Sequence, residues 1–133
     1  MKILVIDGQG GQLGAQIISR INKTELNADI IAVGTNTIAT TSMLKAGAHH
    51  AATGENAVIV NCRHSDVIIG PIGIVIADAL YGEITPKMAL AIAQSQAVRI
   101  LLPMNRCDNL IAGIQDISTK VIIEDAIAKL LNI

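Results

Sequence analysis

The amino-acid sequence predicts a three-layer α/β fold in which one domain, residues 1–133, contains a doubly wound, mainly parallel sheet of five to six strands. Short apolar runs alternate with helical patterns along the whole chain, as is typical of parallel strands joined by helical crossovers. The length suits a single core, and 51% of the residues are hydrophobic against 16% charged. No linker, charge block or internal repeat divides the chain.

The first strand and helix follow from two patterns. After Lys2, residues 3–6 form an unbroken apolar run, which indicates a strand over 2–6 that is buried on both faces. After a group of glycines, Leu13, Ile17 and Ile21 recur at the spacing of a helix that extends to about residue 22.

Two more strand–helix units are expected next. A strand over residues 30–33 ends at Gly34, and Thr35 or Asn36 can cap the helix that follows. Gly47 suits the C-terminal end of that helix. A short strand over 50–52 then leads into a helix over 55–63.

The remaining elements are predicted with one ambiguous stretch. A strand over 67–69 stops at a Gly-Pro pair, and residues 72–83 are too apolar for a plain loop and too rich in glycine for a helix. Thr85 and Pro86 start a helix to about residue 94. We expect a fifth strand over 98–102, a sixth over 110–114, and a final helix from Ser118 to Leu131.

Composition excludes several classes of partner. The formal net charge is −1, so no basic surface is available for nucleic acid. The longest apolar run, 67–77, is far shorter than the roughly 20 residues that a membrane span requires. The two cysteines, Cys62 and Cys107, favour reduced thiols in a cytoplasmic protein. The high apolar content predicts a homo-oligomer, with a dimer as the simplest case.

A glycine-rich segment between the first strand and first helix is the most informative motif. Its glycines lie where backbone N–H groups at a helix N-terminus can bind phosphate. We expect the first glycine to permit a tight turn, the middle ones to admit an anion, and the last to let the helix pack on the sheet. The segment comprises Asp7, Gly8, Gln9, Gly10, Gly11, Gln12, Leu13 and Gly14.

The predicted ligand is a small nucleotide or dinucleotide, such as NAD or NADP. The acidic residue that usually binds ribose after the second strand is missing, although Thr35 or Asn36 can hydrogen-bond a ribose there. Neither NAD nor NADP is favoured. Asp7 would repel a bare phosphate unless it binds a metal or accepts hydrogen bonds from the loop, and the second role is preferred.

Two further segments are candidate parts of the site, and the loops after the first, second and fourth strands are expected to converge on one crevice, because the carboxyl ends of parallel strands share one edge of the sheet. The first segment contains Gly54, Glu55 and Asn56, where Glu55 can also serve as an ordinary acidic residue in a first helical turn. The second segment contains Gly70, Pro71 and Gly73, which can equally form a stiff turn.

No catalytic residues can be assigned from the sequence. The Tyr-Lys pair of short-chain dehydrogenases is absent, and the spacing of His49, His50 and Cys62 does not match a metal site. One alternative is an enzyme whose site is completed across a homodimer, with Asp7, Glu55 or Glu83 as acid or base. The other is a structural or interaction module without a small ligand.

Several segments together resemble a family of small bacterial proteins described as domain of unknown function 3842. The resemblance covers residues 1 to about 105, and it implies a Rossmann-like fold in a stand-alone bacterial protein but no activity. The segments that carry it are Asp7–Gly11, Gly34–Asn36, Met43–Ala48, Ala52–Ala57, Gly70–Ile74 and Gly82–Pro86.

Overall fold

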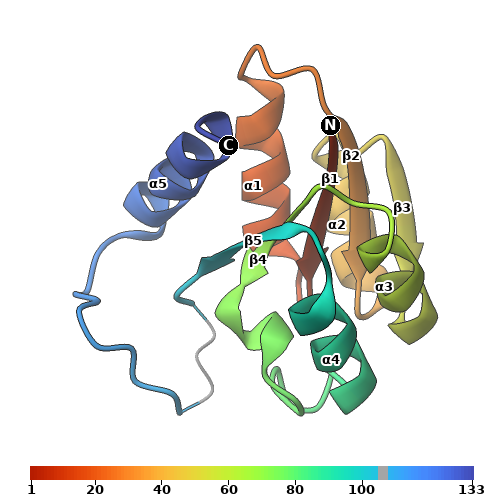
Figure 1. The fold of residues 1–133 in the computed structure, drawn as a ribbon. Helices are drawn as coiled ribbons and strands as arrows, with labels where there is room; N and C mark the ends of the chain where they lie inside the picture. The colour runs from red at the N-terminus through yellow and green to blue at the C-terminus, as the bar shows by residue number, and fades with distance from the viewer. Residues whose placement is uncertain (105–107) are drawn as a thin grey trace.

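A computed structural model describes residues 1–104 and 108–133, and these residues form one five-stranded parallel sheet (Figure 1). The strand order is β3-β2-β1-β4-β5, so the order reverses between β1 and β4. The predicted doubly wound α/β fold is therefore confirmed. The strands are β1 (Lys2–Asp7), β2 (Asp29–Gly34), β3 (His50–Thr53), β4 (Val67–Pro71) and β5 (Val98–Leu102).

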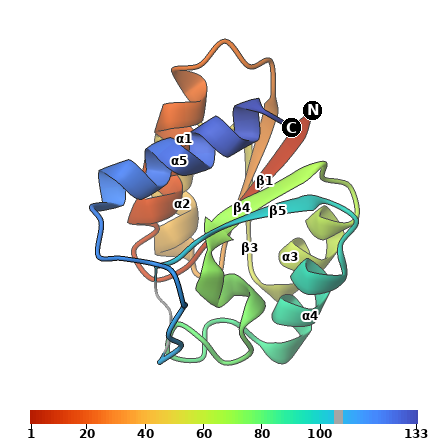
Figure 2. The same cartoon turned by 60° about the vertical axis from the view of Figure 1, so that its left-hand side comes forward.

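Helices cover both faces of the sheet, which gives the three predicted layers (Figure 2). Helices α1, α2 and α5 pack on one face, and α3 and α4 pack on the other. The helices are α1 (Gln12–Asn22), α2 (Thr37–Lys45), α3 (Glu55–Cys62), the 3-10 helix η1 (Ile72–Val75), α4 (Pro86–Gln94) and α5 (Thr119–Leu131).

The central strand explains why an unbroken apolar run predicts a strand here. Side chains of Ile3 and Val5 pack against the α1, α2 and α5 layer, whereas Leu4 and Ile6 pack against α3 and α4. All four are completely buried. A strand covered on both faces needs apolar residues at every position, because successive side chains point to opposite faces.

Three predicted helix starts are confirmed by their caps. The Asn36 side chain accepts a hydrogen bond from the Ala39 N–H at 2.9 Å, so Asn36 rather than Thr35 caps α2. Thr85 caps α4 directly before Pro86. Ser118 caps α5, which ends at Leu131 as predicted.

The predicted sixth strand over 110–114 is wrong. Gly113 adopts φ = +83° within a turn, and Ile114 N–H bonds back to Ile111 over 3.3 Å. Leu110 is 96% exposed. This apolar run therefore lacks the burial that a strand in a covered sheet provides. The ambiguous stretch 72–83 forms η1 and then a series of tight turns.

Cys62 is a free, buried thiol. Burial raises its pKa to about 11, which keeps it protonated and poorly nucleophilic at neutral pH. Cys107 lies outside the described residues. Within the described chain, no helix has the length and apolar character to cross a membrane.

Candidate functional site

The turn after β1 is closed by a hydrogen bond from Gly11 N–H to the Gly8 carbonyl at 2.9 Å. The left-handed conformations of this turn fall on Gln9, with φ = +51°, and on Gly11, with φ = +72°. Gly8, which we expected to provide the tight turn, does not adopt one. Gly11 is also the N-cap of α1, and no side chain caps that helix.

Close packing explains two of the other glycines. A Cβ on Gly14 would lie 2.5 Å from Met43 Sδ and 3.0 Å from Asp7 Cβ, which confirms that this glycine lets α1 pack closely. A Cβ on Gly8 would lie 2.8 Å from Leu80 Cδ1. In contrast, a Cβ on Gly10 would meet only the Gln12 side chain, at 3.9 Å. The fold therefore tolerates a side chain at Gly10.

The buried carboxylate of Asp7 stabilises the glycine loop through hydrogen bonds. Asp7 is 2% exposed, and its two carboxylate oxygens accept hydrogen bonds from the N–H groups of Gly8 and Gly14, each at 2.8 Å. The sequence favoured this role for Asp7, as an acceptor of hydrogen bonds from the loop. Burial raises the pKa of Asp7 above its usual 3.8, the two N–H groups oppose that rise, and the nearby charge of Glu83 adds to it.

Glu83 lies at the centre of the predicted ligand site. Its Oε1 accepts hydrogen bonds from the Gln9 N–H at 2.9 Å, the Thr35 hydroxyl at 2.6 Å and the Asn36 side-chain amide at 2.7 Å. We call these three groups the donor cluster. Two of its members are the residues predicted to bind ribose, and the third belongs to the glycine loop. The site therefore already holds a carboxylate.

The pKa of Glu83 reflects this environment. Partial burial alone would raise it, but the hydrogen bonds from Thr35, Gln9 and Asn36 together lower it below its usual 4.5. At neutral pH the carboxylate is thus ionised, and each of the three hydrogen bonds is charge-assisted.

The loop also presents donors that are not used within the chain. Among the described residues, the N–H groups of Gly10, Gln12 and Leu13 have no hydrogen-bond partner. Two side chains hold the outer part of the loop: Ser42 donates to the Gly10 carbonyl at 2.9 Å, and Asn36 donates to the Gln9 carbonyl at 3.0 Å. The start of α1 is therefore well positioned and open to an acceptor.

The loop after β3 reaches the site through the α4 cap. The Thr85 hydroxyl donates to Glu55 at 2.6 Å, which ties the start of α3 to the segment that contains Glu83. Gly54 is the N-cap of α3, and its N–H bonds to the Gly34 carbonyl at 2.9 Å. Asn56 is exposed and takes no part in the hydrogen bonds of the donor cluster.

Gly70 and Pro71, which were predicted to stop the fourth strand, are instead the last two residues of β4, and Gly73 lies in η1. This segment has a packing role in the structure. Gly70, Pro71 and Gly73 are buried, and a Cβ on Gly70 would collide with the Ile6 carbonyl oxygen. These residues close the end of the sheet between β1 and α4. Among the described residues, the loops after β1 and β2 supply the donor cluster, and neither this segment nor the loop after β3 contributes a hydrogen bond to it.

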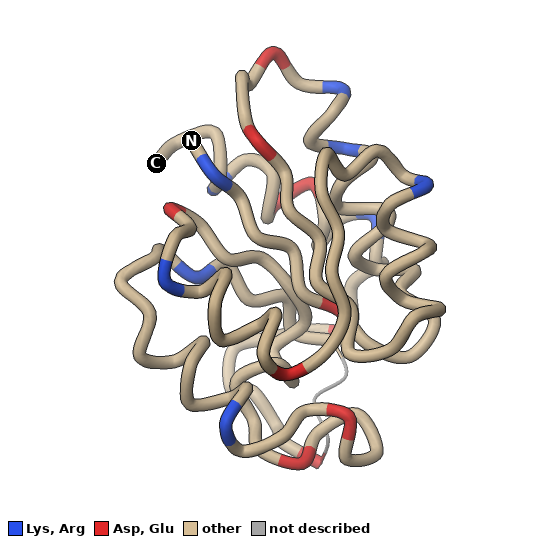
Figure 3. Tube along the Cα trace, turned by 90° about the vertical axis from the view of Figure 1, so that its right-hand side faces the viewer, with Lys and Arg blue, Asp and Glu red and all other residues tan. Residues whose placement is uncertain are grey.

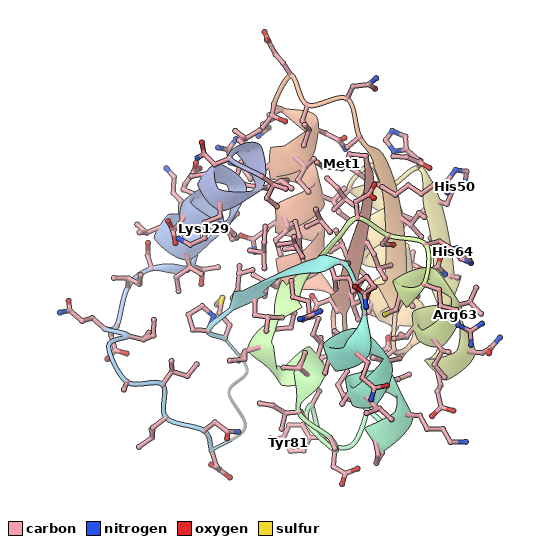
Figure 4. All side chains as sticks on the ribbon, in the orientation of Figure 1. Met1, His50, Arg63, His64, Tyr81 and Lys129 are labelled. Atoms are coloured by element: carbon pink, nitrogen blue, oxygen red, sulfur yellow. The ribbon has the colours of Figure 1, made fainter. Side chains whose placement is uncertain are left out.

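The histidines lie elsewhere. His50 and His64 are on the molecular surface (Figure 4), and His49 accepts a hydrogen bond from the Ile30 N–H at 2.9 Å. Among the described residues, no group of three or more His, Cys, Asp or Glu side chains is placed to hold a metal ion.

A separate groove of about 560 Å³ lies between α3 and α4. Arg63, Lys87 and Leu90 contribute to its lining. Its lining includes no residue of the glycine loop or of the donor cluster, and its polar groups come from α3, α4 and the segments that follow these helices. We therefore assign the candidate site to the donor cluster.

Acidic positions lie close together at the end of the molecule that carries the carboxyl ends of the strands (Figure 3). Asp7 and Glu83 belong to this end. An anionic ligand would meet negative charge here, so a divalent cation or the removal of a carboxylate would favour its binding.

The ionisation of Glu83 makes a pH-dependent contribution to stability. A lowered pKa stabilises the fold fully above the usual value of 4.5, and this stabilisation is lost as the pH falls through the folded-state pKa. We expect the difference in unfolding free energy between wild type and Glu83→Gln to be largest at neutral pH and to shrink below pH 4.5. Urea titrations at several pH values measure it. A difference that grows on acidification would contradict the assigned direction.

Comparison with known proteins agrees with the sequence resemblance. The model of a family described as "Domain of unknown function (DUF3842)" matches residues 2–133, so the similarity extends beyond residue 105 to the end of α5. A search of curated proteins finds no match. A crystal structure of a dodecameric FMN-dependent Ubix-like decarboxylase from Escherichia coli O157:H7 is similar, with a TM-score of 0.46 and 14% identity over 99% of this chain and 93% of that chain.

Proposed function

This chain belongs to the family described as Domain of unknown function (DUF3842), and we propose that it binds a nucleotide or dinucleotide at the glycine loop after β1. The donor cluster is the observation that carries the proposal. Groups from the loops after β1 and β2 converge on one anionic oxygen of Glu83, which lies in the connection after β4, and the strand order reverses between β1 and β4. Open α/β sheets bind their ligands at this point.

The ligand would use two kinds of group. A phosphate would lie on the N–H groups of Gly10, Gln12 and Leu13 at the start of α1 and on that of Gln9, where the helix dipole favours negative charge. The Gly11 N–H is not available to it, because this group donates to the Gly8 carbonyl. The ribose would lie near Thr35 and Asn36. NAD, NADP and mononucleotides all carry this combination of groups, so the geometry supports the ligand class rather than one member of it.

A thermal melt followed by circular dichroism tests the proposal. We would add NAD, NADP, their reduced forms, ATP, GTP and S-adenosylmethionine, each with and without magnesium. A ligand at a hundred times its dissociation constant should stabilise the fold by about 2.7 kcal/mol. The melting temperature would then rise by roughly 8–10 °C.

The variant Gly10→Val shows whether the loop is the binding site. A Cβ at Gly10 meets only the Gln12 side chain at 3.9 Å, so the variant should melt like wild type without ligand. Its side chain would obstruct the loop N–H groups and abolish the ligand-induced shift. Ala128→Val, on the exposed face of α5, is the control and should keep the shift. An equal shift in Gly10→Val would place the ligand elsewhere.

The two alternatives give different results. An enzyme whose site is completed across a homodimer would show turnover that Asp7→Asn and Glu55→Gln remove, although in this structure both carboxylates accept hydrogen bonds from groups of the same chain. A structural module would show no ligand-induced shift. The predicted homo-oligomer remains a prediction. Exposed apolar side chains such as Leu110 and Ile38 are available for self-association.

A further inference from the structure

Glu83 holds the donor cluster from a distant part of the chain. It lies 74 residues after Gln9, in the connection between η1 and α4, and it belongs to neither of the loops that form the cluster. All three hydrogen bonds end on the same oxygen, Oε1. A single carboxylate oxygen surrounded by a backbone N–H, a hydroxyl and an amide occupies the position that a ligand oxygen would need.

We propose that Glu83 is an internal latch, whose carboxylate occupies the donor cluster in the free protein and must leave before an anionic group of a ligand binds there. This inference rests on the proposed nucleotide-binding function. The Gln9 N–H has one hydrogen and can serve one acceptor well. Two anions in the same cluster would also repel each other. Binding at the cluster and the contact with Glu83 are therefore mutually exclusive.

The backbone around Glu83 is fixed by hydrogen bonds and by buried side chains. Residues 78–84 are closed by hydrogen bonds from Asp78 N–H to the Ile84 carbonyl at 2.7 Å and from Ile84 N–H to the Ala79 carbonyl at 3.1 Å. Ala79, Leu80 and Ile84 are at most 3% exposed. The loop is thus fixed to the core by apolar side chains and needs no movement to release the latch.

The Glu83 side chain can move without that loop. It is partly exposed, and its contacts with the donor cluster are all made by the terminal carboxylate. Tyr81, in the same loop, is fully exposed and points outward (Figure 4). Rotation of the Glu83 side chain toward solvent would expose the donor cluster while the buried side chains keep the loop closed.

Gly8 makes the latched position possible. A Cβ on Gly8 would lie 3.2 Å from Glu83 Oε1 and 2.8 Å from Thr35 Oγ1. The glycine that follows β1 therefore gives the carboxylate room to approach the loop. This close approach is a second consequence of the glycine motif, in addition to the room that Gly10 leaves for a ligand.

Titration calorimetry with ADP as the probe tests the latch. We expect ADP to bind at least tenfold more tightly to Glu83→Ala than to wild type, because a site blocked in nine molecules of ten loses about tenfold in apparent affinity. Glu83→Asp keeps the charge but is one methylene shorter, so it cannot reach all three donors and should also bind more tightly. Glu25→Ala, an exposed carboxylate before β2, should bind like wild type.

Each outcome has a separate meaning. Tighter binding by both Glu83 variants supports the latch. Equal or weaker binding by Glu83→Ala leaves nucleotide binding intact and overturns the latch, since Glu83 would then contact the ligand or be irrelevant to it. Tighter binding by Glu83→Ala alone assigns the effect to lost charge and also overturns the latch. If Glu83→Ala does not fold, the affinity of Glu83→Asp for ADP tests the latch by itself: tighter binding than wild type supports it, and equal or weaker binding overturns it. Absence of binding in all variants refutes the proposed function and the latch with it.

Discussion

Replacement of Gly11 by alanine is expected to destabilise the protein by about 3 kcal/mol, because a strained backbone and an overpacked contact add to each other. Gly11 has φ = +72°, a conformation that L-residues rarely adopt. A Cβ there would also lie 2.6 Å from Ala39 Cα and 2.7 Å from the Ala39 carbonyl oxygen, both in the backbone of α2. Neither can be relieved by rotating a side chain.

A denaturant titration of Gly11→Ala beside Gly10→Ala provides the test. The two variants make the same chemical change at adjacent positions of one loop, but a Cβ on Gly10 has only one neighbour, at 3.9 Å. We expect Gly10→Ala to lie close to wild type. Melting temperatures should separate the two variants by roughly 10 °C. Equal stability of the variants would mean that α2 does not pack against Gly11 as described.

Replacement of Asp7 by asparagine is expected to cost about 2 kcal/mol, since it leaves a buried N–H group without an acceptor. The two carboxylate oxygens of Asp7 accept from Gly8 and Gly14. An asparagine has one oxygen and would turn an NH₂ group toward the other N–H. Because Asp7 is 2% exposed, water cannot readily replace the lost hydrogen bond.

The pH dependence of this effect is opposite in sign to that of Glu83. The raised pKa of Asp7 means that its contribution to stability is complete below the usual 3.8 and is lost as the pH rises through the folded-state pKa. The penalty of Asp7→Asn should therefore grow as the pH falls toward 3.8. Asp116→Asn, at an exposed position, is the control and should have no measurable effect. If Asp116→Asn lowered the unfolding free energy as much as Asp7→Asn does, the loss of buried hydrogen bonds at Asp7 could not explain the effect.

Local sequence patterns were sufficient for most of the secondary structure. The strand over 2–6 was predictable because a strand that is buried on both faces has consecutive apolar residues, as β1 has over residues 3–6. The start of α4 was predictable because Thr85 and Pro86 satisfy the local requirements of a helix N-terminus. The same reasoning failed at 110–114, where apolar residues are exposed and Gly113 forms a turn.

The α/β class and the position of the glycine loop follow from the sequence, and the sequence also favoured the role that Asp7 has in the structure. Each of these depends on neighbours in the chain or on the alternation of apolar strands with helices. Long-range packing, in contrast, determines which groups meet at the strand ends. Glu83 and Gln9 are 74 residues apart, and no periodicity connects them. Their contact depends on how the η1–α4 connection packs across β1, a long-range choice governed by the buried side chains of Leu80 and Ile84.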